Sequence, residues 1–191
     1  MGYNSLAALP YIPYNILQSL ATNPNAEDIW KMIAYNDYDC LSKPNLTLEE
    51  KLSYVWKTGR QDAYSVFFTN LIEDAIAESK CILKIYDYYI HADGMYNSTT
   101  VYAFDFIYGG TMALVDYNGV PVSRWDLFVH KLMACLNGQF VGGVGTLQFF
   151  GQQSRYDLGR SVIGNSKTFT GGQIFMSVMV GDGGVDDGCG G

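Results

Sequence analysis

The stretch TTVYAFDFIY, Thr99–Tyr108, decides the fold of this 191-residue chain. Residues of this stretch alternate between two faces of an extended strand, as a β-strand requires. One face carries Tyr102, Phe104, Phe106 and Tyr108, and the other carries Val101, Ala103, Asp105 and Ile107. Because no Lys or Arg stands beside the aromatic face, base stacking is disfavoured and core packing, or a subunit interface, is the expected use of that face.

Further strands are predicted on both sides of this stretch. Cys81–His91 is rich in aromatic and β-branched residues and ends at Ala92-Asp93-Gly94. Val144–Phe150 and Phe169–Val180 give two more strands, and Ser65–Thr69 gives a weaker one. Residues Leu71–Ser79 fit a short helix equally well, and the polar stretch Gly151–Ser166 is expected to be a loop.

The clearest helix follows a predicted loop, Val115–Val120, which contains Asn118-Gly119. Ser123 is its expected N-cap with Asp126 three residues later, and Asn137-Gly138 stops it. Its apolar residues recur at helical spacing, which predicts a buried stripe packed on the sheet. They are Trp125, Phe128, Val129, Leu132, Met133 and Leu136.

Three shorter helices are predicted nearer the N-terminus. One covers Tyr14–Ala21 after Pro13, and one begins at Asn25 as N-cap, with Asp28 at N3, and runs to about residue 35. A third opens with the capping box Thr47-Leu48-Glu49-Glu50, continues through Val55 and Trp56, and ends at Gly59.

These elements predict an α+β fold, a mainly antiparallel sheet of about four to five strands packed by one long helix, with short N-terminal helices. We expect a single domain over residues 1–180, with a helical part over 13–59 and a sheet-and-helix part over 63–180. Residues 181–191 are expected to form a flexible Gly/Asp tail, because they hold too few apolar side chains to offset their ordering entropy.

The charge balance excludes several classes of function. The net charge is −7 and the isoelectric point about 4.6, which argues against binding of nucleic acid through a basic patch. The four scattered cysteines, Cys40, Cys81, Cys135 and Cys189, predict reduced thiols without a zinc site or a disulfide framework. No signal peptide and no apolar run of about 18 residues is found, so assembly in the cytoplasm is expected.

Catalytic, cofactor and metal sites are not predicted. His91 and His130 are isolated and are expected on the surface. The glycines of Gly142-Gly143-Val144-Gly145 follow a helix and precede a strand, the reverse of a dinucleotide-binding loop. The carboxylates of residues 181–188 lack EF-hand spacing, so a solvated tail is favoured over a calcium site.

Three segments carry a resemblance to a known family. The stretch from Cys40 to Lys51, CLSKPNLTLEEK, resembles the segment "Leu-Ser-Lys-Pro-Asp-Leu-Thr-x-Glu-Glu-Lys" of neck or tail-terminator proteins of tailed bacteriophages, with Asn45 in place of Asp. The passage Leu136–Phe149 is similar to the family's "Leu-Asn-Gly, Gly-Ile-Gly-x-Leu" passage, and residues 29–37 resemble its short helix before a Tyr-Asn-Asp turn. The matching residues are Ser42, Lys43, Pro44, Leu46, Thr47, Glu50, Leu136, Asn137, Gly138, Gly143, Gly145 and Leu147.

The resemblance implies a structural virion protein and not an enzyme. Such a subunit forms a homo-oligomeric ring, commonly a hexamer, that caps the tail tube, contacts neighbouring connector and tail proteins, and lets DNA pass. The chain departs from the family pattern at residues 63–79 and in its tail. The loops at Asn118 and Gly151 and the tail are expected to carry intersubunit contacts.

Three alternatives stay open from the sequence. One is another virion connector or tail-tube component, and one is a peptide-binding adaptor domain that uses an open sheet edge. The third is a small enzyme whose site would draw on distant residues such as His91, Asp105 and Asp187.

Overall fold

The computed structural model of the protein describes residues 9–70, 80–92, 97–141, 145–149 and 169–181. Its helices are α1 (Ile12–Thr22), α2 (Glu27–Ala34), α3 (Leu48–Ser53) and α4 (Arg124–Leu136). Its strands are β1 (Val66–Phe67), β2 (Ile82–Ala92), β3 (Asn97–Gly109), β4 (Leu114–Tyr117), β5 (Val120–Ser123), β6 (Phe140–Val141), β7 (Gly145–Gln148) and β8 (Phe169–Gly181).

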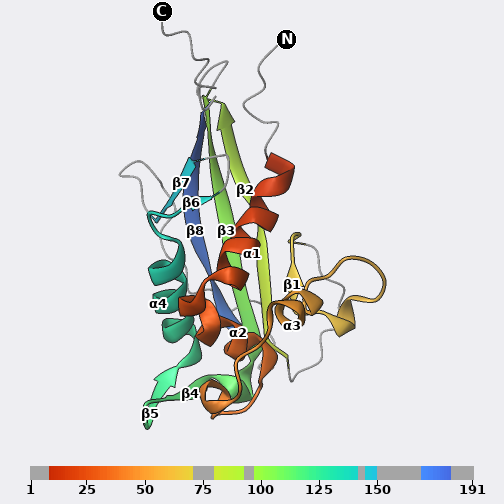
Figure 1. The fold of residues 1–191 in the computed structure, drawn as a ribbon, viewed down its shortest axis with the longest axis vertical. Coiled ribbons are helices and arrows are strands. Elements are labelled where there is room, and N and C mark those ends of the chain that lie inside the picture. Colours follow the sequence, from red (N-terminus) through yellow and green to blue (C-terminus); the bar gives the residue numbers. More distant parts are fainter. Residues whose placement is uncertain (1–8, 71–79, 93–96, 142–144, 150–168, 182–191) are drawn as a thin grey trace, which may run out of the picture.

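A six-stranded sheet forms the centre of the molecule, in the order β1-β2-β3-β8-β7-β6 (Figure 1). The three long strands β2, β3 and β8 pair antiparallel, whereas β1 pairs with β2 in parallel at Leu83 and Lys84. A separate two-stranded hairpin, β4-β5, lies at one end of the molecule. The α+β class is thus confirmed, and the predicted four to five strands are one or two too few for the main sheet.

The main core lies between one face of the sheet and the helices α1, α2 and α4 (Figure 1). The predicted aromatic face of β3 is buried here, and the rings of Phe106 and Phe128 stack with centroids 4.1 Å apart. A Cβ at Gly172 of β8 would lie 2.5 Å from the Trp125 ring, so only glycine allows this helix to pack so closely.

The predicted helix after Ser123 is present as α4, but the structure does not show one long helix that packs the sheet alone. Helix α4 has 13 residues and α1 has 11, and both contribute fully buried residues to the same core. The sheet is therefore covered by several short helices, because each presents only a narrow apolar stripe that cannot cover the three long strands alone.

Two predicted helix ends are corrected by local hydrogen bonds. The side chain of Asn23, and not that of Asn25, forms a cap, and it caps a 3₁₀ turn, Pro24–Ala26, that precedes α2. The capping box of Thr47 and Glu50 is confirmed, but α3 ends at Ser53, because Val55 forms a parallel bridge with Val66 of the sheet edge. Gly59 has a φ of +81° but lies beyond the helix.

The predicted loop Val115–Val120 is instead the centre of the β4-β5 hairpin. Asn118 and Gly119 both have positive φ, +57° and +80°, which is the geometry that a tight two-residue hairpin turn requires. The helix cap after it is confirmed, since the Ser123 hydroxyl accepts from the Asp126 amide at 3.3 Å.

Several expectations lie outside the described residues: the nature of 71–79, the glycine turn at 142–144, the loop 151–166 and the tail 182–191. Among the described cysteines, Cys40, Cys81 and Cys135 are free and buried, as predicted. Burial raises the pKa of all three thiols, and that of Cys81 reaches about 11.

Candidate functional site

The first group of family-like residues organises the chain between α2 and α3. The Lys43 ammonium lies 3.1 Å from Asp39 and 3.5 Å from Asp37, and the Ser42 hydroxyl donates to the Asp39 carbonyl at 2.8 Å. Thr47 accepts from the Glu50 amide at 3.2 Å, and this hydrogen bond starts α3. Hydrogen bonding by Thr47 lowers the pKa of the Glu50 carboxyl.

A buried ion pair anchors this segment to α2. The Glu27 carboxylate lies 2.6 Å from the Lys51 ammonium and also accepts from the Leu46 amide at 2.7 Å. Their side chains are only 14% and 7% exposed, so water screens this pair little. The segment that carries the resemblance is therefore locked to the helical layer at Leu46 and Lys51.

The second group joins the end of α4 to the sheet. The Asn137 side chain accepts from the Phe149 amide at 2.8 Å, and Gly138, with φ +77°, donates to the Leu147 carbonyl at 2.8 Å. Leu147 is fully buried. The Asn-Gly pair therefore both stops the helix and fixes β7.

The structure does not bring the two groups together. Residues 42–50 lie nearer the end of the molecule that holds the β4-β5 hairpin, and residues 136–141 and 145–147 lie at the other end of α4 (Figure 1). Of the predicted residues, Gly143 lies outside the described part of the chain. The described residues of both groups have architectural roles.

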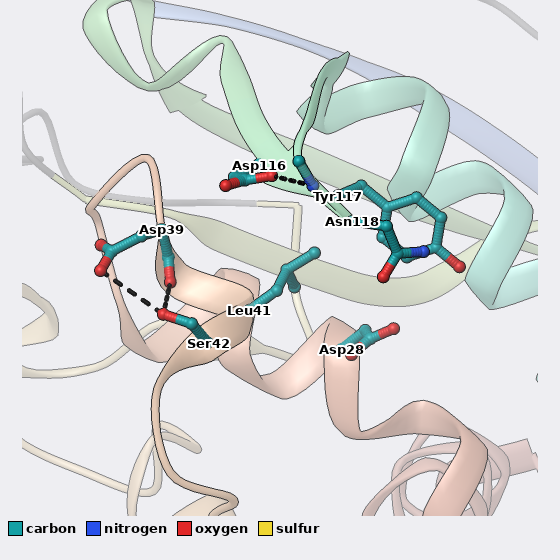
Figure 2. Close-up of a pocket in the computed structure, with 8 residues that line it drawn as sticks. Asp28, Asp39, Leu41, Ser42, Asp116, Tyr117 and Asn118 are labelled. Carbon is teal, nitrogen blue, oxygen red and sulfur yellow. Dashed lines mark hydrogen bonds between the residues drawn. The ribbon is translucent and has the colours of Figure 1, made fainter.

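A pocket of about 520 Å³ opens beside the first group, and sequence reasoning missed it. Figure 2 shows Asp39, Leu41 and Ser42 on one side of the pocket and Asp116, Tyr117 and Asn118 on the other, with Asp28 contributed by α2. The Asp116 amide donates to the Tyr38 carbonyl at 2.8 Å, which holds the hairpin against the segment before α3.

The charge of the pocket is dominated by aspartates. Asp28 is paired with Lys131 of α4 at 2.7 Å, and this ammonium also lies 5.2 Å from the centre of the Tyr117 ring. The Asp116 carboxylate accepts from the Gly119 amide at 2.7 Å. Among the described residues, Asp116 has no basic partner.

A polar cluster crosses the centre of the sheet on the face away from α1 and α4. Lys84, Asp105 and Gln173 occupy one row across β2, β3 and β8. The Asp105 carboxylate lies 3.0 Å from the Lys84 ammonium and accepts from Gln173 at 2.6 Å and from Tyr86 at 3.2 Å. The Asp105 carboxylate is therefore surrounded by donors from all three strands. These contacts hold β2, β3 and β8 in their observed register.

The Tyr86 hydroxyl in this cluster makes stability depend on alkaline pH. Burial and the charge of Asp105 raise the pKa of Tyr86 above its ordinary value of 10. Above about pH 10 the unfolded chain loses this proton while the folded chain keeps it, so the free energy of unfolding falls as pH rises. Tyr86→Phe is therefore expected to show a shallower alkaline loss in urea titrations between pH 9 and 11.

The control for this prediction is Tyr102→Phe. Burial also raises the pKa of Tyr102, but its buried hydroxyl has no hydrogen-bond partner among the described residues. Both variants are expected to flatten the alkaline slope, while only Tyr86→Phe loses about 1 kcal/mol at pH 7. A Tyr86→Phe slope equal to that of the wild type would contradict the prediction.

Arg124 is a fully buried cation at the first position of α4. Its guanidinium donates to the carbonyls of Met32 at 2.9 Å, Tyr35 at 3.3 Å, Asn36 at 3.5 Å and Asp37 at 3.1 Å. These carbonyls stand at and after the C-terminus of α2, where a cation is favoured. Arg124 therefore fastens α4 to the end of α2.

The outer part of β2 forms an exposed apolar surface. Residues 82–85 of β2 are buried, whereas residues 87–91 are exposed, although β3 beside them is mostly buried along its length. A bulge between Asp87 and Tyr89 interrupts the register. We call this exposed end of the sheet the outer sheet surface, with Tyr88, Tyr89 and, on β8, Met179 on one face and Ile90, in register with Thr100, on the other. These side chains are 39–65% exposed.

The residues of the enzyme alternative do not converge. His91 stacks on Tyr89 and pairs in register with Thr99, six positions along β3 from Asp105 or roughly 20 Å. Asp187 lies outside the described residues. Within the described ranges, no three His, Cys, Asp or Glu side chains gather as metal ligands do.

Charged residues inside apolar strands were the signal for the features that sequence reasoning missed. Lys84 stands between Leu83 and Ile85, and Asp105 between Phe104 and Phe106. Such charges at buried positions need partners, so their pairing could have been inferred. Arg124 likewise stands at a helix N-terminus, where a cation is unfavourable unless something else holds it.

The protein is a small α+β chain with a six-stranded sheet, a pocket lined by three aspartates, and two groups of residues with architectural roles. The sequence model of the YomW family matches residues 26–178. The chain therefore belongs to this family, and YomW is a phage-derived protein family name. No curated protein and no solved structure is similar to the chain. None of the helices among the described residues is long and apolar enough to cross a membrane.

Proposed function

We propose that the chain is a structural subunit of the neck of a tailed-phage virion, a tail-terminator or head–tail joining ring that caps the tail, connects it to the head and lets DNA pass. The phage-derived family name and the three segments that resemble neck or tail-terminator proteins support this assignment. The acidic balance of the chain, −7, suits a ring through which DNA slides without binding.

The outer sheet surface carries the proposal. Beyond Lys84, no described strand pairs with the outer edge of β2, and the same segment exposes Tyr88, Tyr89 and Ile90. Figure 1 shows β2, β3 and β8 extending past α1 at this end. A strand edge that no described strand covers, beside exposed apolar side chains, is a surface suited to assembly, and a second copy of the chain is the occupant we assign to it.

Light scattering over a concentration series tests this proposal, together with a search for the chain in virions or connector particles. Self-association into a ring, or a monomer that becomes a ring with its neck neighbours, is expected. A monomer at every concentration that is absent from all particles would overturn the proposal.

Ile90→Lys locates the interface. Ile90 is 39% exposed, so a lysine can reach water in the free subunit but places an unpaired charge inside the assembled interface. Self-association is expected to weaken by at least about tenfold, which corresponds to about 1.4 kcal/mol. Leu48→Lys, at a 45% exposed position of α3, is the matched control and is expected to assemble like the wild type.

A further inference from the structure

The exposed positive charge of the described residues gathers around one loop, between α3 and β1. Of the nine described Lys and Arg residues, four are buried and two pair with aspartates beside the pocket. The remaining three stand on the segment between α3 and β1 and just before β2. They are Lys57, Arg60 and Lys80, and we call them the basic loop.

Hydrogen bonds hold this loop in a defined shape. The Trp56 indole donates to the Gly59 carbonyl at 3.1 Å, and the Lys80 ammonium donates to the Asp62 carbonyl at 2.7 Å. Arg60 pairs with Asp62 at 2.6 Å, yet its side chain remains 86% exposed. The loop therefore presents a cation outward without further ordering.

The acidic pocket and the basic loop lie on different flanks of the molecule. In Figure 1 the segment between α3 and β1 projects on the right, and the β4-β5 hairpin that forms one wall of the pocket lies at the lower left. Their charges are opposite, and the two lie apart in the fold of one chain (Figure 1). Two different complementary patches on separate flanks are what a head-to-tail ring contact requires.

We propose that the pocket of one subunit receives the basic loop of the next, with Arg60 of one copy beside Asp116 and Tyr117 of its neighbour. This inference rests on the proposed ring and identifies a second intersubunit contact within it. Asp116 supplies a carboxylate without a basic partner among the described residues, and the Tyr117 ring already accepts the ammonium of Lys131. The pocket volume of about 520 Å³ admits a guanidinium and its stem.

Charge reversal with rescue tests the contact. Arg60→Glu and Asp116→Lys are each expected to weaken self-association of the full chain by about 10- to 100-fold in sedimentation velocity, because like charges then face each other. The double variant Arg60→Glu/Asp116→Lys restores the opposite charges and is expected to return to within about threefold of the wild type. An equimolar mixture of the two single variants is expected to assemble as well.

Two further variants separate a loss of charge complementarity from other effects of the substitutions. Asp116→Asn keeps the acceptor for the Gly119 amide while it removes the charge, so it weakens assembly without opening the hairpin turn. Glu49→Lys makes the same change of charge as Asp116→Lys at an exposed position of α3 and is expected to leave assembly unchanged.

The outcomes separate this inference from the proposed function. A wild-type oligomer that neither reversal weakens, or single defects without rescue in the double variant, would overturn the inference and leave the ring intact. A wild-type chain that stays monomeric at all concentrations and in all particles would overturn both.

Discussion

Arg124→Met is expected to lower the free energy of unfolding by about 3 kcal/mol. The substitution removes a buried charge, which recovers several kcal/mol of desolvation cost. It also removes the donor of four carbonyls around the end of α2, and each hydrogen bond from a charged group contributes about 1.5–3 kcal/mol. Because the losses outnumber the single gain, we expect net destabilisation, which urea unfolding at low protein concentration measures.

Arg60→Met provides the matched control. The Arg60 side chain is 86% exposed, so its replacement is expected to change the free energy of unfolding by no more than about 0.5 kcal/mol. Arg124→Lys should fall between the two, because one ammonium cannot span all four carbonyls. An Arg124→Met variant as stable as Arg60→Met would show that the hydrogen bonds from Arg124 to the end of α2 contribute nothing to stability.

Lys51→Met is expected to cost about 3–5 kcal/mol of unfolding free energy, because it leaves the Glu27 carboxylate buried without its cation. Glu27 also holds the Leu46 amide, so the segment before α3 is expected to loosen as well. Thermal and urea unfolding of the single variant check the magnitude.

The double variant Glu27→Leu/Lys51→Met separates the two contributions. It removes the stranded charge and is expected to recover about half of the loss, with the remainder reflecting the Leu46 amide that no longer has its acceptor. If the double variant were less stable than Lys51→Met, the unpaired carboxylate would not be the cause of the loss.

The family-like segments connect elements of the fold. The segment from Ser42 to Glu50 connects α2 to α3 through Glu27, Lys51 and the capping box, and it forms one wall of the acidic pocket. The Asn137-Gly138 pair fixes β7 on the sheet. The residues that carry the resemblance thus maintain the frame that presents two separate surfaces.

Local patterns in the sequence determined several elements correctly. The alternation over Thr99–Tyr108 determined β3, the run Cys81–His91 determined β2, and the Ser123 and Thr47 caps determined where two helices begin. Each depends on side chains within a few residues of one another, so periodicity and capping chemistry suffice to predict it. The free thiols of Cys40, Cys81 and Cys135 followed from their spacing in the same way.

Tertiary structure alone decided where α3 ends, which helices share the core and which charges meet. Helix α3 stops because Val55 pairs with Val66, and Arg124 is bound by carbonyls about 90 residues earlier in the chain. The row of Lys84, Asp105 and Gln173 and the pocket between Asp39 and Asp116 join segments far apart in sequence. Such contacts depend on strand order and helix packing, which no local periodicity encodes. The positions of the acidic pocket and of the outer sheet surface follow from these contacts.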